Sequence, residues 1–396
     1  MTKLNNSLAA LDHDYWTLIS SDPDIFNDMI KEYGVNDTKA EELLAIDFAN
    51  LEDDGPVHGL IFISEYVEEP LPKEWSNEDP DEDNIVFTSQ VITNACGTLA
   101  LLNVLLNSEI EDKGDILNSF NNFTTGFSSV NRGLCLGNSD EIRRIHNAYS
   151  PATHKVDNLI MSQTSTGSAK KQDKEIFTDE YEKMYHYISY IYKSGFIWEL
   201  DGLKKRPHKL TKCSKDEWLK MTEPIIQSRM KNLENTESGL EFSLLAIRHD
   251  NYEKMVTDNT ILKSNIHKLD SICNKDTPLL LVKEETTAGL NGFPSLQAAW
   301  KDVEIGALES VKPRLDTLSH DQMILDSRIS MVEENRILSR DNVVKQKFDY
   351  FPFVDLIIKK SLKRGLLEEP EAPKPKRKRK ASAEKPTTKR NTRAKK

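Results

Sequence analysis

Two residues that could form part of an acyl-transfer site lie close together in this sequence. Gln90 stands six residues before Cys96, and Cys96 is followed by an apolar run, residues 99–106, that predicts a buried helix. A thiol at the start of a helix lies near unpaired backbone N–H groups and the positive end of the helix dipole, and both favour the thiolate. The sequence therefore predicts that Cys96 is a cysteine nucleophile.

A base for this nucleophile is offered by a predicted hairpin later in the chain. Residues 184–191 are rich in β-branched and aromatic residues, which predicts a strand that carries His186. Lys193, Ser194 and Gly195 predict a turn, and residues 196–203 predict the return strand that carries Asp201. Such a hairpin could bring the Asp201 carboxylate to the imidazole, fix its tautomer and stabilise its cation.

These segments resemble the ubiquitin C-terminal hydrolases, the cysteine peptidases that cleave after the C-terminal glycine of ubiquitin. The resemblance covers roughly residues 10–235 and is strong in four places, listed here: residues 14–23 followed by 33–35, residues 56–62, residues 90–96 and residues 186–201. It implies a papain-like α/β fold, with an antiparallel sheet flanked by helices and a knotted backbone. We therefore expect residues 10–235 to form the catalytic domain, with a crossover loop at about 149–179 that limits what can reach the cysteine.

The resemblance also implies a role for each site residue. Cys96 would be the nucleophile, His186 the general acid and base, and Asp201 the residue that orients His186. Gln90 would stabilise the oxyanion, together with the Cys96 backbone N–H. No metal or other cofactor is expected.

Other candidate residues receive structural interpretations. His58 competes with His186 as the base, but no carboxylate-bearing hairpin lies beside it in the sequence. Cys135, Cys213 and Cys273 lack partners at metal-ligand spacing, and we expect free thiols.

The sequence of the second half of the chain predicts that it is mostly helical. A seven-residue apolar repeat from Leu240 onward predicts a coiled-coil-like helix over residues 236–275, with an ordinary amphipathic helix as the alternative. We expect a linker or helix over 276–313, a helical adaptor-binding domain over 314–368 and a basic tail over 369–396. The aromatic residues of segment 347–357 suit an interface anchor or a local core equally well.

The adaptor-binding segment resembles one found only in the proteasome-associated and Polycomb-type branches of the family. The first branch implies a ubiquitin-receptor subunit of the proteasome as partner, besides ubiquitin and its conjugates. The second implies an adaptor of the additional-sex-combs type and a ubiquitinated core histone as substrate. Total length and the short C-terminal domain favour the proteasomal branch, whereas the basic tail favours the other.

Composition is typical of a nuclear or cytoplasmic enzyme. Four cysteines in 396 residues do not form a disulfide framework, and we expect neither a signal peptide nor a membrane span. Residues 371–396 carry 12 Lys or Arg against two Glu, so the first 370 residues carry a net charge of −21. The tail predicts nuclear import, contact with nucleic acid, or a purely solvated segment.

Two other functions stay open on the sequence alone. The chain could be a catalytically quiet ubiquitin-binding scaffold, although the four complete catalytic positions argue against this. It could also be a cysteine protease that acts on a different ubiquitin-like modifier.

Overall fold

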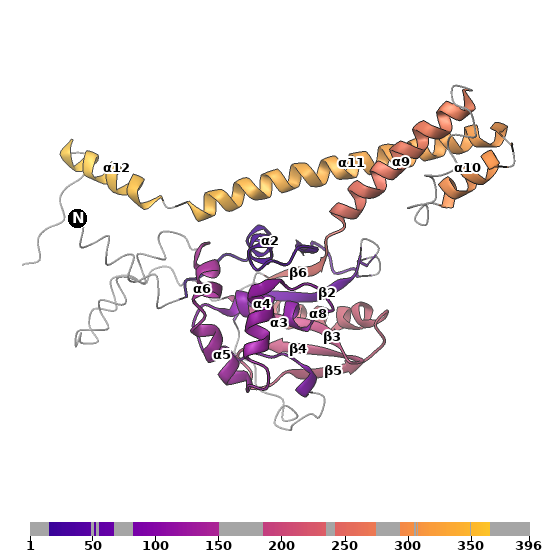
Figure 1. Ribbon diagram of the computed structural model, residues 1–396. Helices are drawn as coiled ribbons and strands as arrows, with labels where there is room; N and C mark the ends of the chain where they lie inside the picture. The colour runs from indigo at the N-terminus through magenta and orange to yellow at the C-terminus, as the bar shows by residue number, and fades with distance from the viewer. Residues whose placement is uncertain are drawn as a thin grey trace, which may run out of the picture. The chain divides into compact units, whose positions relative to one another are not determined.

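The computed structural model describes the catalytic region and most of the helical extension (Figure 1). The described residues are 16–48, 51–52, 55–66, 82–149, 185–234, 242–274, 294–304, 306, 308–348 and 350–364. The chain divides into two compact units, residues 1–348 and residues 349–396. Most of the expected crossover loop and all of the basic tail lie outside the described residues.

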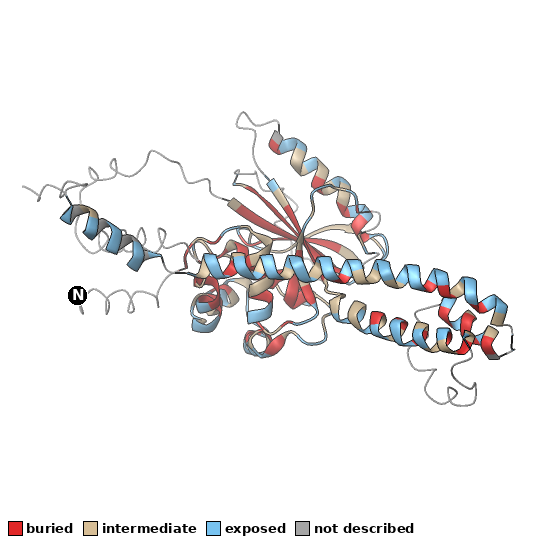
Figure 2. Ribbon diagram, turned by 90° about the horizontal axis from the view of Figure 1, so that it is seen from above, coloured by how far each residue is buried: buried red, intermediate tan, exposed pale blue. Residues whose placement is uncertain are grey.

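A six-stranded antiparallel sheet forms the centre of the first unit. Its strand order is β1-β6-β2-β3-β4-β5. The strands are β1 (Thr38–Glu42), β2 (Val57–Glu65), β3 (Tyr185–Lys193), β4 (Phe196–Asp201), β5 (His208–Lys212) and β6 (Phe242–His249). The central strands are apolar on both faces, as expected for a sheet that is covered on both sides. Figure 2 shows that they are buried along most of their length.

Helices cover both faces of this sheet. One face packs against a cluster built largely from α2 (Pro23–Glu32), α3 (Cys96–Asn107), α4 (Gly114–Phe123), α5 (Ser129–Gly137) and α6 (Asp140–Asn147). The other face packs against α8 (Trp218–Glu234), through Trp218, Leu219 and Ile226. The predicted α/β architecture, an antiparallel sheet flanked by helices, is confirmed.

The predicted hairpin is also present. Strands β3 and β4 pair in register, with Ile188 opposite Asp201 and Lys193 opposite Phe196. Ser194 and Gly195 form the turn, both with positive φ. The hairpin therefore carries His186 and Asp201 to the same end of the sheet.

Residues 242–249 differ from the sequence prediction. They were expected within the helix 236–275, but they form β6, which lies between β1 and β2. Leu244 and Ala246 face one core cluster while Leu245 and Ile247 face the other. A short segment that is apolar on both faces has the same sequence pattern whether it forms a strand or a buried helix. Its secondary structure therefore depends on the strands that it pairs with. The helix itself, α9 (Tyr252–Cys273), begins after β6.

The extension is a helical bundle within the first unit. Helix α9 packs against α10 (Pro294–Glu304) and the 40-residue α11 (Leu308–Lys347). Leu262 and Leu269, which are seven residues apart in α9, are buried against these helices. Helices α9 and α11 are antiparallel, since Tyr252 bonds to Glu333 whereas Asn259 bonds to Asp326.

The predicted boundary between residues 313 and 314 is wrong. Residue 314 lies inside α11, and the boundary between the two compact units falls between residues 348 and 349. The second unit contains α12 (Phe351–Lys363). The local sequence does not reveal this boundary, because α11 is held in the first unit by its packing on α9 and α10, which are distant in the chain.

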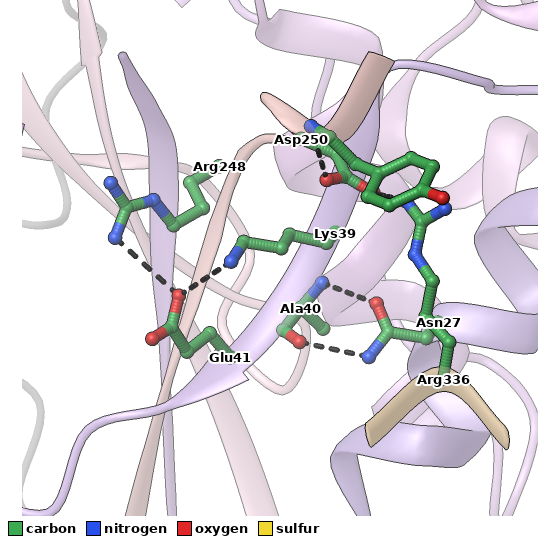
Figure 3. A network of polar contacts seen from close by, with 8 residues as sticks. Asn27, Lys39, Ala40, Glu41, Arg248, Asp250 and Arg336 are labelled. Atoms are coloured by element: carbon green, nitrogen blue, oxygen red, sulfur yellow. Dashed lines mark hydrogen bonds and ion pairs between the residues drawn. The ribbon is translucent and has the colours of Figure 1, made fainter. Parts of the chain in front are cut away.

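Polar contacts fix α11 and the edge strand β1 to the rest of the first unit (Figure 3). Arg336 of α11 lies 2.6 Å from the Asp250 carboxylate and 3.7 Å from the centre of the Tyr252 ring. The side-chain amide of Asn27 in α2 donates to the Ala40 carbonyl at 2.9 Å. Its oxygen accepts the backbone N–H of Ala40 at 2.7 Å. The Asn27 amide therefore pairs two backbone groups of an edge strand.

Within the described part of the chain, every helix is too short or too polar to span a bilayer.

Candidate active site

Cys96 is the first residue of α3, as predicted. Ala95 precedes it and provides no side-chain cap, and the first helical N–H bond runs from Leu99 to the Ala95 carbonyl. The N–H groups of Cys96 and Gly97 are therefore available to the sulfur and to an incoming oxyanion.

His186 and Asp201 meet at the end of the hairpin. The imidazole Nε2 lies 2.8 Å from Oδ1 of Asp201, and both side chains are buried. The Nε2–H direction is not aligned on the carboxylate, so the contact is an electrostatic pair rather than a well-formed hydrogen bond. Because Nε2 faces Asp201, Nδ1 is the ring nitrogen left for a proton from a thiol.

The loop before α3 places Gln90 beside Asp201. The backbone N–H of Gln90 donates to the Gly202 carbonyl at 2.7 Å. A Cβ at residue 202 would lie 3.3 Å from the Gln90 Cβ, which is tighter than ordinary contact. A glycine at this position lets the Gln90 loop approach the end of β4.

Cys96 lies against the strand that carries His186. Its Sγ is 3.8 Å from the carbonyl oxygen of Tyr185, the residue before His186. A Cβ at Gly97 would touch the Tyr187 ring at 3.5 Å. The structure thus gathers Cys96, His186, Asp201 and Gln90 from a helix start, two strand ends and a loop.

The pKa of the Cys96 thiol is higher than expected from its position at a helix start. Burial raises its pKa to about 11, although the backbone N–H groups of Gly97 and Cys96 act in the opposite direction. The helix-start effect is therefore present, but desolvation outweighs it. The resting sulfur is a neutral thiol, and a base must take its proton.

The pKa of Asp201 is shifted toward the charged form, in contrast to that of Cys96. Burial alone would raise the pKa of this carboxyl group, but the contact with His186 and the Leu203 N–H lower it below its usual value. That N–H donates to Oδ1 at 2.9 Å. Asp201 is therefore a carboxylate over the whole range in which an imidazole titrates.

His58 lies far from these residues. It is in β2, six residues from Ser64, the sheet partner of His186, which is about 20 Å along a strand. Burial, followed by the charges of His249 and Lys113, lowers the pKa of His58 to about 4. His58 therefore lies outside the group formed by Cys96, His186, Asp201 and Gln90. All four cysteines are free thiols.

Two residues beside the site, Tyr66 and Asn94, are not among those predicted from the sequence. The Tyr66 ring meets the His186 ring edge to face, with centroids 5.8 Å apart. Asn94, two residues before Cys96, has φ of +67°, a left-handed conformation that is costly for a residue with a side chain. No local pattern marks Tyr66, whereas an asparagine just before a helix is a known signal for such a turn.

The family follows from comparison with known proteins. The model of "Ubiquitin carboxyl-terminal hydrolase, family 1" matches residues 16–231, more than half of the chain. The chain belongs to this family. It is a cysteine-type ubiquitin carboxyl-terminal hydrolase.

Individual relatives agree with this assignment. "Ubiquitin carboxyl-terminal hydrolase isozyme L5" of Dictyostelium discoideum is 31% identical over 88% of this chain and 92% of its own length. "Ubiquitin carboxyl-terminal hydrolase BAP1" of Xenopus tropicalis is 28% identical over 72% of this chain but only 42% of its own length. Among solved structures, the Trichinella spiralis UCH37 catalytic domain bound to ubiquitin vinyl methyl ester is 33% identical. It covers 59% of this chain and 96% of that chain, with a TM-score of 0.46.

Proposed function

We propose that this hydrolase works through Cys96, His186, Asp201 and Gln90. The Cys96 sulfur attacks the carbonyl carbon of the C-terminal glycine of ubiquitin, and the thiol proton passes to Nδ1 of His186. The resulting imidazolium is stabilised by Asp201, and it then protonates the departing amine as the C–N bond breaks. A thioester links ubiquitin to Cys96 at this stage.

Hydrolysis of the thioester uses the same residues. His186 takes a proton from water, the hydroxide attacks the thioester carbonyl, and the thiolate leaves and is reprotonated by His186. In both steps the oxyanion accepts hydrogen bonds from the Cys96 N–H and the Gln90 amide. Loss of one such donor typically lowers turnover by about 10²- to 10³-fold.

The observation that carries this proposal is the convergence of the site. Two contacts support it: His186 lies 2.8 Å from Asp201, and the Cys96 Sγ lies 3.8 Å from the carbonyl oxygen of Tyr185, the residue before His186. The neutral resting thiol makes a base necessary, and Nδ1 of His186 is the ring nitrogen not taken by Asp201.

The test is hydrolysis of a ubiquitin C-terminal fluorogenic amide. We expect Cys96→Ala to abolish hydrolysis while ubiquitin binding persists, because binding does not require the sulfur. Cys213→Ala is the matched control, since this half-buried thiol lies near the hairpin turn, at the opposite end from His186 and Asp201. Full activity of Cys96→Ala would refute the assignment of the nucleophile.

We further propose that the C-terminal helices recruit a ubiquitin-receptor subunit of the proteasome. Tyr350 and Phe353 of the second unit are 46% and 59% exposed, which suits an interface anchor better than a local core. The near-complete coverage of the isozyme L5 relative supports the proteasomal branch over the Polycomb-type branch. Affinity capture with the purified adaptor, and its loss in Phe353→Ala, tests this proposal; selective capture by an additional-sex-combs-type adaptor would favour the alternative.

We also propose that the enzyme resides in the nucleus and the cytoplasm, with residues 374–380 as the import signal. Deletion of this segment should shift a fluorescent fusion to the cytoplasm. The same segment could contact nucleic acid, and a gel-shift series in rising salt would detect that.

A further inference from the structure

His146 is a completely buried histidine that the mechanism above does not use. It lies near the end of α6, and its ring packs on Trp16 with centroids 4.8 Å apart. Its Nε2 is 2.6 Å from the Thr17 carbonyl oxygen, and its Nδ1 is 2.7 Å from the Thr98 hydroxyl. A carbonyl can only accept, so Nε2 carries the proton.

The charge state of the His146 ring decides which atom donates in its hydrogen bond with Thr98. Burial lowers the pKa of His146 to about 4, against the opposing effect of the Thr17 carbonyl. The ring is therefore neutral at working pH, and Nδ1 accepts a hydrogen bond from the Thr98 hydroxyl. His146 is a fixed bridge with one donor and one acceptor.

One end of this bridge holds the helix that carries Cys96. Thr98 is the third residue of α3, so it lies in the same first turn as the nucleophile. This turn contains the N–H groups that act on the sulfur. Ala95 provides no cap, so the Thr98 bond to His146 is a side-chain tether at this helix start.

The other end holds the turn just before Cys96. Thr17 is fixed by His146 and by Asn147, whose Oδ1 accepts from the Thr17 N–H at 3.1 Å and from its hydroxyl at 3.0 Å. The neighbouring Trp16 carbonyl accepts a hydrogen bond from the Asn94 amide at 3.2 Å. Asn94 is the left-handed residue two positions before Cys96, and such a conformation persists only when its surroundings hold it.

We propose that His146 is a positioning residue for Cys96, because it ties the first turn of α3 and the strained turn at Asn94 to the same Trp16–Thr17 segment. The inference rests on the proposed role of Cys96 as nucleophile. His146 does not touch substrate. It holds the Cys96 and Gly97 N–H groups where the sulfur and the oxyanion need them.

The test compares four variants in the full-length chain with the fluorogenic amide. His146→Phe keeps the ring on Trp16 but removes both bonds, and His146→Asn keeps an acceptor near the position of Nδ1. Thr98→Val removes only the hydroxyl. His58→Phe is the matched control, because it replaces another histidine whose pKa is lowered to about 4, at the far end of β2.

We expect His146→Phe to lower kcat by about ten-fold or more while KM changes by less than about two-fold, since small misplacements of reacting groups act on the chemical step. His146→Asn should recover part of this loss, and Thr98→Val should reproduce part of it. The pH profile of Cys96 alkylation by iodoacetamide, followed by mass spectrometry, should show a higher thiol pKa in His146→Phe. Circular dichroism fixes the folded fraction of each variant.

The outcomes separate the two proposals. If His146→Phe and Thr98→Val match His58→Phe in kcat and in thiol pKa, His146 is only structural and the inference is overturned. If Cys96→Ala is fully active, the proposed nucleophile is wrong instead. Should His146→Phe fail to fold, Thr98→Val still decides, because valine and threonine have nearly the same size and shape.

Discussion

Replacement of Asp201 by asparagine isolates the contribution of one carboxylate to catalysis. Asp201 is buried, 2.8 Å from His186, and its Oδ1 also accepts the Leu203 N–H. An asparagine can still accept from Leu203, so the end of β4 should keep its shape. What is lost is the negative charge opposite the imidazolium that forms when Cys96 gives up its proton.

The size of the effect follows from that single interaction. Once the imidazolium forms, we expect the His186–Asp201 contact to tighten into a hydrogen bond between charged groups. Such a bond contributes about 1.5–3 kcal/mol, and 1.4 kcal/mol corresponds to a factor of ten. We therefore expect kcat/KM of Asp201→Asn to fall by about 10- to 100-fold. This loss is partial, because the Cys96 sulfur, the Cys96 N–H and Gln90 remain.

The assay is steady-state hydrolysis of the ubiquitin fluorogenic amide, with thermal denaturation of each variant. Tyr190→Phe is the control, because it removes a buried hydrogen bond to Glu199 from the same hairpin without touching His186. A kcat/KM within about two-fold of wild type would refute the orienting role, since it falls far below the effect of one charged hydrogen bond. A loss as complete as that of Cys96→Ala would show that Asp201 does more than orient the ring.

Two further predictions concern the supports of the site. In Gly133→Ala the new Cβ would clash with the Ser89 carbonyl oxygen, so α5 and the Gln90 loop must separate. We expect kcat to fall by about ten-fold, and wild-type kinetics would contradict this. The folded pKa of His146 is about 4 against 6.5 in the unfolded chain, so the unfolded state binds the extra proton and acid favours unfolding. His146 should therefore lower the free energy of unfolding by about 3 kcal/mol between pH 7 and pH 4. Denaturant titrations of His146→Phe should show a pH dependence that is smaller by this amount. Equal pH slopes in the two proteins would contradict the assignment.

Some parts of this protein are determined locally, and the sequence alone predicts them. The hairpin was predictable because a run of β-branched and aromatic residues on each side of Ser194–Gly195 leaves one sensible pairing. The start of α3 near Cys96 was predictable because a mostly apolar run, residues 99–106, follows it. The register of the β3–β4 hairpin then brings His186 and Asp201 together. The remaining expectations for residues 10–235 rest on the family resemblance.

Other parts were decided only by tertiary structure. Residues 242–249 are a strand because β1 and β2 offer hydrogen-bonding partners on both sides, which the local apolar pattern does not reveal. The Cys96 thiol is neutral because packing removes water from it, and desolvation depends on residues distant in the chain. His146 meets Thr98 and Thr17 across 48 and 129 residues. Backbone propensity and side-chain periodicity act over a few residues, whereas burial and its electrostatic consequences are properties of the assembled core.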